Sequence, residues 1–129
     1  MKDLKLTIEI NRPAKEIFDF TLNPENTPKW VDFIGHEETD EWPVKLGTIY
    51  RNRANPGAEW SEFKLSEYDP GKLFTLSKVD GSYNVRYVFK PITPDTTELE
   101  YYEWTDEVEL EVPFTMESLQ KLKNILEKT

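Results

Sequence analysis

The chain of 129 residues is predicted to form an α+β fold: an antiparallel sheet of six or seven strands, two short helices after the first strand, and a C-terminal helix. Three observations lead to this prediction. A strand-like alternation opens the chain, short strand-like segments separated by turn residues fill its middle, and a helical period closes it. We expect a single domain over residues 1–129, because a chain of this length can bury a core without disulfides.

The first strand and the first helix follow from local pattern. Residues 4–10 alternate strictly between apolar and polar side chains, which is typical of a strand with one buried face. Pro13 then stands where a helix can begin, since its missing N–H costs nothing in a first turn. We therefore expect a short helix over residues 13–20, with an apolar face formed by Ile17 and two phenylalanines.

A second short helix is expected over residues 24–33, after an Asn-Pro pair that interrupts the first. Pro28 would start a turn of this helix rather than sit inside it. Its buried side would hold Trp30, Phe33 and Ile34.

Six further strands are expected in the middle of the chain, each bounded by turn signals. Residues 55–57 and 69–71 each combine proline with glycine, and Asp80-Gly81 is expected to form a hairpin turn of type I′. The strands are expected over residues 36–41, 47–53, 58–68, 73–79, 82–90 and 97–108.

The last segment changes to a helical period. Leu119, Leu122 and Leu126 recur at helical spacing, and Thr115 is suited to the N-cap. A helix over residues 116–128 would be about 20 Å long, at about 1.5 Å per residue. It can cross a sheet of six or seven strands only diagonally.

Composition excludes several classes of function. The 25 acidic and 16 basic residues give a net charge of −9, which argues against binding nucleic acid or an anionic membrane surface. The chain has no cysteine and one histidine, so we expect no disulfide, no zinc site and no cofactor. It has no signal-peptide pattern and no apolar run of about 18 residues, so we expect no membrane insertion and a cytoplasmic location. The acidic stretches 37–41 and 106–111 lack a calcium-loop pattern and are expected to be solvated strand edges.

Three segments resemble the START / birch-pollen-allergen-like superfamily, and within it the small proteins of polyketide cyclase/dehydrase type. They are residues 10–30, where a proline opens a helix and a tryptophan follows; residues 65–73, a strand end and its turn; and the strands around residues 87–89 and 97–101. The resemblance implies a helix-grip fold, in which a curved sheet closes over the C-terminal helix. It also implies a cavity between them for lipids, sterols, polyketides or plant hormones.

The superfamily also contains cyclases, ring-hydroxylating oxygenase subunits and a chaperone activator. The absence of a Cys/His cluster excludes an iron-bearing oxygenase subunit here. The C-terminal helix is short beside that of the family.

Aromatic residues are the candidates for a ligand-binding wall. Seven are predicted to line it, with the tyrosine hydroxyls supplying the polar contacts that orient a ligand. The alternative is that they form an ordinary core packed by the terminal helix. The candidates are Trp30, Phe33, Tyr50, Trp60, Tyr83, Tyr87 and Tyr101.

Two residues are candidates for proton transfer. Glu103 shares the strand face of two inward residues, where a buried carboxylate would have a raised pKa or a partner such as Arg51, Arg53 or Arg86. The alternative is that Glu103 reaches solvent at the strand end. His36 is a candidate general base at the cavity mouth, or else an ordinary surface histidine.

These observations lead to three hypotheses for function. The first is a carrier or sensor, a monomer or homodimer, that binds a small apolar or amphipathic ligand of lipid-, sterol- or polyketide-like chemistry. The second is an enzyme of aromatase/cyclase or dehydratase type, in which Glu103 or His36 moves protons. The third is a domain that binds a protein partner, as in the chaperone-activator branch, through its outer sheet face rather than a cavity.

Overall fold

The computed structural model describes residues 2–106 and 114–128. Within these residues it has seven strands and three helices, in the predicted order. The strands are β1 (Lys2–Ile10), β2 (His36–Thr39), β3 (Ile49–Arg53), β4 (Ser61–Asp69), β5 (Leu73–Lys78), β6 (Tyr83–Thr93) and β7 (Thr96–Thr105). The helices are α1 (Ala14–Leu22), α2 (Thr27–Trp30) and α3 (Met116–Glu127).

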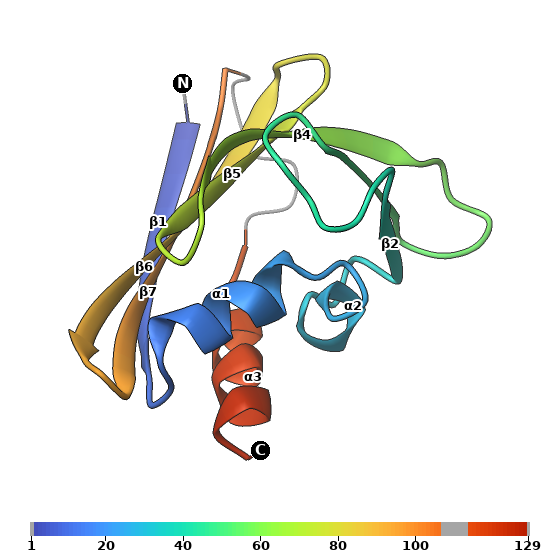
Figure 1. Cartoon of the computed structure of the whole chain (residues 1–129). Helices are drawn as coiled ribbons and strands as arrows, with labels where there is room; N and C mark the ends of the chain where they lie inside the picture. The colour runs from blue at the N-terminus through green and yellow to red at the C-terminus, as the bar shows by residue number, and fades with distance from the viewer. Residues whose placement is uncertain (1, 107–113, 129) are drawn as a thin grey trace.

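The strands described form one antiparallel sheet in the order β1-β7-β6-β5-β4-β3-β2. Because β1 pairs with β7, the first strand lies beside the last one in the sequence. Figure 1 shows the sheet curving around the three helices, which lie together on one side of it. We call this side the inner face and the opposite side the outer face. Helix α3 packs against β1 and α2, and α1 packs against β6, so the predicted helix-grip arrangement is confirmed.

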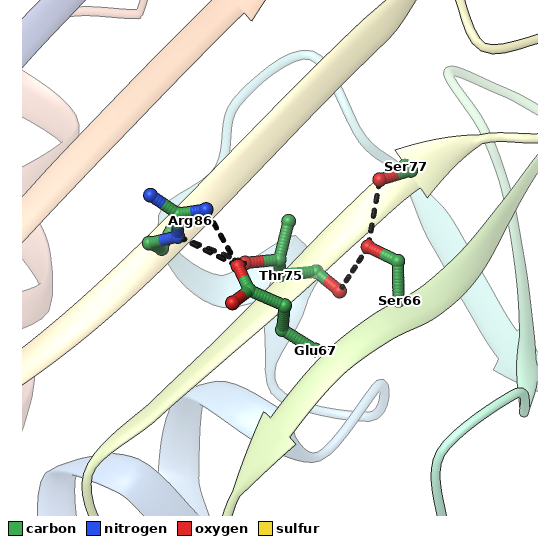
Figure 2. Close-up of polar contacts among 5 residues, drawn as sticks. All are labelled: Ser66, Glu67, Thr75, Ser77 and Arg86. Atoms are coloured by element: carbon green, nitrogen blue, oxygen red, sulfur yellow. Dashed lines mark hydrogen bonds and ion pairs between the residues drawn. The ribbon is translucent and has the colours of Figure 1, made fainter.

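A bulge in β4 contributes to the bend of the sheet. The register between β4 and β5 shifts between Leu65 and Glu67, so that Ser66 and Glu67 both lie on the outer face. Figure 2 shows both side chains in hydrogen bonds with residues of β5 and β6. Such an extra residue bends the bulged strand and increases its twist, which helps the sheet to wrap the helices.

The core lies between the inner face and the helices. Alternate residues of β6 and β7 are buried there, as predicted, and Leu119 and Leu122 of α3 are fully covered. The inward residues of these two strands are Tyr83, Val85, Tyr87, Phe89, Thr97, Leu99, Tyr101, Glu103 and Thr105.

The second helix is shorter than predicted. It spans only α2, since Val31 is already extended (φ −104°, ψ 100°) and ends the helix. Pro28 lies in its first turn, as predicted. The predicted burial of Phe33 is wrong, because this side chain is 45% exposed beyond the helix.

The turn between β5 and β6 also differs from the prediction. A type I′ turn needs positive φ at both central residues, whereas Asp80 does not adopt one and Gly81 does (φ 79°). The Asp80 carboxylate instead accepts a hydrogen bond from the Ser82 N–H at 2.8 Å, which stabilises a longer loop. Residues 107 and 108 of the predicted last strand, and most of the acidic stretch 106–111, lie outside the described residues.

Candidate functional site

Tyrosines and one tryptophan meet on the inner face. Tyr87 of β6 lies directly opposite Tyr101 of β7, and their rings meet edge to face with centroids 5.3 Å apart. Trp30 of α2 packs edge-on against Tyr87 at 6.1 Å. Tyr83 lies two residues before Val85 on the same face of β6. The structure thus brings four of the seven predicted aromatic residues into one wall under the helices.

Glu103 is fully buried beside this wall. Its Oε2 accepts a hydrogen bond from the Tyr83 hydroxyl at 2.9 Å, and its Oε1 accepts one from the backbone N–H of Phe114 at 2.9 Å. Burial raises the pKa of Glu103, while these hydrogen bonds act in the opposite direction. Of the two alternatives for this residue, the buried carboxylate is the one found.

The suggested arginine partners of Glu103 lie on the outer face. Arg86 pairs with Glu67 at 2.6 Å, and Arg51 pairs with Glu38 at 3.5 Å. The reason is strand alternation: inward residues flank Arg86 in β6, so its own side chain points outward. Among the described residues Glu103 is therefore held by neutral donors instead of a cation.

Burial raises the pKa values of the phenols in the wall. The pKa of Tyr83 and that of Tyr101 both lie above their ordinary value, with burial as the main cause. Their hydroxyl oxygens are 3.4 Å apart. At neutral pH these groups remain protonated, so they can donate hydrogen bonds to a ligand or to Glu103.

The Tyr50 hydroxyl supports the fold, whereas those of Tyr83 and Tyr101 lie in the wall. Its side chain is almost fully buried, and its hydroxyl donates a hydrogen bond to the Leu22 carbonyl at 2.7 Å. Carbonyls in the last turn of a helix lack an intrahelical partner, so this bond fastens the end of α1 to the sheet. Tyr50 lies on the inner face as predicted, with its polar group used for support.

Sequence reasoning missed Glu37, which was expected on a solvated edge. Its Oε1 accepts a hydrogen bond from the Thr27 hydroxyl at 2.6 Å, and its Oε2 accepts one from the Asn52 amide at 3.1 Å. Burial raises its pKa to about 6. β2 is polar on both faces, so hydrophobic alternation carried no signal that Glu37 points inward.

Trp30 carries a buried donor without an acceptor. The residue is 1% exposed, yet its indole N–H has no hydrogen-bond partner among the described residues. A buried polar group without a partner is uncommon in native structures and unfavourable. This N–H is therefore a place where an oxygen of a ligand would be stabilised.

His36 and Trp60 lie apart from the wall, and the prediction that Trp60 lines it is wrong. Trp60 precedes β4 and packs on the outer face, edge-on to His36 with centroids 5.4 Å apart. The guanidinium carbons of Arg51 and Arg53 lie 4.8 and 4.2 Å from its ring centroid. His36 is on β2, which four strands separate from the β7 strand of Glu103. The two proton-transfer candidates are not brought together.

Two open pockets also lie outside the wall. One, of about 440 Å³, is lined by residues of the α1–α2 connection, β2 and Trp42. The other, of about 650 Å³, surrounds Trp60 at the ends of β3, β4 and β5. Between sheet and helices, aromatic rings pack closely, with Phe74 stacked on Tyr87 at 4.7 Å. A ligand cavity in this interior remains a prediction.

Two further observations concern the described residues only. No helix in this part of the chain is long and apolar enough to cross a membrane. No three carboxylate or imidazole side chains in it converge as ligands of a metal ion would.

Solved structures share this architecture. Norcoclaurine synthase from Thalictrum flavum, solved with dopamine and hydroxybenzaldehyde, aligns with a TM-score of 0.70 at 14% identity, over 98% of this chain and 87% of that chain. A protein from Mesorhizobium loti aligns with a TM-score of 0.75 at 13% identity, over 99% and 98%. The di-domain ARO/CYC protein BexL aligns with a TM-score of 0.67 at 14% identity, over 99% of this chain and 41% of its own. At such identities the likeness shows the fold alone.

Comparison by sequence is consistent with this likeness. No curated protein matches the chain. The model of one family, described as polyketide cyclase / dehydrase and lipid transport, matches residues 1–126. This confirms the resemblance stated from the sequence: the chain belongs to the polyketide cyclase / dehydrase and lipid transport family.

Proposed function

We propose that the protein binds a small apolar or amphipathic ligand, of lipid-, sterol- or polyketide-like chemistry, between the inner face and α3, as a carrier or sensor. The observation that carries this proposal is the unpartnered N–H of Trp30, enclosed on the face where Tyr101 and Glu103 also lie. Buried donors without an acceptor are uncommon in native structures. Among the described residues there are three, and the Trp30 N–H is the one on the inner face; the other two are the Nε atoms of Arg51 and Arg53 beside Trp60.

The wall supplies both the apolar surface and the polar groups that such binding needs. Its aromatic rings offer apolar surface, whose burial contributes roughly 25 cal/mol per Å². The Tyr83 hydroxyl, the Glu103 carboxylate and the Trp30 N–H are polar groups that can fix the orientation of a ligand.

A thermal shift screen against fatty acids, sterols, flavonoids and polycyclic aromatics tests the proposal. A ligand at about 100 times its Kd should add roughly 2.7 kcal/mol, a shift of several degrees for a chain of this size. Tyr101→Ala should abolish a true hit, whereas Trp60→Ala on the outer face should leave it unchanged. Equal loss in both variants would contradict the inner site, and silence across the screen would favour the partner-binding alternative.

The second candidate is an enzyme of aromatase/cyclase or dehydratase type. The observation that favours it is the buried carboxylate of Glu103, whose pKa is raised and which lies beside two phenols. Such a group is suited to accept and return a proton. Glu103→Gln separates the candidates: a carrier would change only its affinity, whereas an enzyme would keep binding its substrate and lose turnover.

A further inference from the structure

Phe114 lies within the proposed site, just before α3. Its ring stacks on Tyr101 with centroids 4.0 Å apart and planes within 19°. Trp30 meets the same ring edge-on at 5.8 Å, and Phe33 does so at 6.3 Å. Only 5% of Phe114 is exposed. Three aromatic side chains thus hold this one ring.

The backbone of Phe114 is fastened to the same site. Its N–H donates the 2.9 Å hydrogen bond to Oε1 of Glu103, while the Tyr83 hydroxyl donates to Oε2. One residue of the chain therefore covers the Tyr101 ring and donates a hydrogen bond to one of the two oxygens of the buried carboxylate. Both features would otherwise be open to a ligand.

We infer that Phe114 occupies the place of a ligand's ring, so that a planar aromatic compound with an oxygen acceptor must displace Phe114 to bind. This inference rests on the proposed function and narrows it.

The chemical class follows from the groups that Phe114 contacts. Phe114 lies against Tyr101 as a stacked aromatic ring, with centroids 4.0 Å apart, and a planar compound can take such a place better than a sterol or a branched chain. Trp30 packs edge-on against this ring, and its indole N–H has no partner among the described residues, so an oxygen acceptor such as a phenolic hydroxyl or a carbonyl would suit it. The exposed Phe33 at the edge of this cluster places solvent close to it.

The test compares 2-naphthol binding to the wild-type chain, Phe114→Ala and Phe18→Ala, by equilibrium dialysis. Phe18 is the matched control, because it is a buried phenylalanine whose ring contacts Tyr68, Phe74 and Phe89 and not the wall. Wild type must expel its own ring, so Phe114→Ala should bind 2-naphthol about tenfold more tightly or better, and Phe18→Ala should not. If Phe114→Ala does not fold, Phe114→Leu, which keeps bulk but not planarity, should show a smaller tightening in the same direction.

A second comparison tests the oxygen acceptor. In the Phe114→Ala background, 2-naphthol should bind more tightly than naphthalene, and Trp30→Phe should remove this preference while keeping an aromatic ring. Equal affinity of wild type and Phe114→Ala for 2-naphthol would overturn the displacement and leave the proposed function standing. Binding of sterols or fatty acids, with no 2-naphthol bound by either chain, would overturn the ligand class alone. Failure of every compound with every variant would overturn the proposed function itself.

Discussion

The two faces of the sheet each hold a glutamate at the centre of a hydrogen-bond network, and the two networks are opposite in character. On the outer face, Glu67 accepts hydrogen bonds from the Thr75 hydroxyl at 2.8 Å and from Arg86 at 2.6 and 2.9 Å (Figure 2). On the inner face, Glu103 accepts hydrogen bonds from one phenol and one backbone N–H. One carboxylate has a cation as partner, whereas the other has neutral donors among the described residues.

The pKa values move in opposite directions as a result. The Thr75 hydroxyl and the Arg86 guanidinium lower the pKa of Glu67, because both stabilise its charged form. Burial raises the pKa of Glu103, because it removes water from around the charged form. The outer glutamate is thus suited to hold strands together, and the inner one to exchange protons or bind a ligand.

The surroundings of Trp60 and Trp30 differ between the two faces in the same way. Trp60 on the outer face is flanked by two guanidinium groups, a favourable cation–π arrangement. Trp30 on the inner face is enclosed by rings and keeps an unpartnered N–H. The two tryptophans thus differ in their surroundings, which are charged on the outer face and aromatic on the inner face.

The largest expected effect is the loss of stability when a buried residue of the inner face is truncated, compared with an exposed residue. Phe74→Ala should lower the free energy of unfolding by about 3–5 kcal/mol, because it empties the stack between Tyr87 and Phe89. Ile92→Ala, in an exposed position of β6, should change it by less than about 0.5 kcal/mol. Urea unfolding measures both, and similar losses would mean that the inner face is not the core.

Removing the inner carboxylate should have the next largest effect. Glu103→Leu leaves the Phe114 N–H and the Tyr83 hydroxyl without their acceptor, which should cost about 1–3 kcal/mol at pH 7. Glu103→Gln, whose amide oxygen can still accept one of the two bonds, should cost less. If urea unfolding shows Glu103→Leu to be as stable as wild type, the inner network contributes nothing to the fold.

A pH series should separate the inner carboxylates from the outer one. The pKa of Glu37 is raised to about 6 from an ordinary 4.5, so the folded state binds the proton more tightly than the unfolded state. Its stabilising contribution is therefore complete below about pH 4.5 and is lost as the pH rises through about 6, by up to about 2 kcal/mol.

Glu37→Gln should remove this part of the pH dependence of unfolding. Glu38→Gln, on the neighbouring exposed residue, should keep it. Stability that rises through the same interval in wild type would contradict the assignment. Glu67 should behave in the opposite sense, because its lowered pKa makes its contribution disappear as the pH falls.

The smallest effect is expected for the outer ion pair. Arg86→Met removes the partner of Glu67 but keeps an apolar stem over Trp104, so it should cost about 0.2–1 kcal/mol. Most of this difference should vanish in 1 M salt, since exposed charges are screened there. A larger loss, or one independent of salt, would mean that the outer network is more than a surface ion pair.

Much of the fold was predictable because its signals are local. The alternation in β1, β6 and β7 and the spacing of leucines in α3 each involve residues a few positions apart. The same alternation correctly placed Tyr101 and Glu103 on one face. The closure of the sheet over α3 was implied by the family resemblance, not by any pattern of residues.

The sequence by itself determined which residues of β1, β6 and β7 share a face, since apolar side chains alternate along these strands. It did not do so in β2, which is polar on both faces, or at the bulge of β4. Only the tertiary structure decided which residues lie next to each other in space. The donors to Glu103 come from positions 20 residues before it and 11 after it, and Glu37 is held by residues of α2 and β3. Strand register and helix packing set these contacts, and both depend on the whole chain. That is why the sequence could name Glu103 as a candidate without deciding between its two alternatives, and gave no sign of Glu37, the Trp30 N–H or the ring of Phe114.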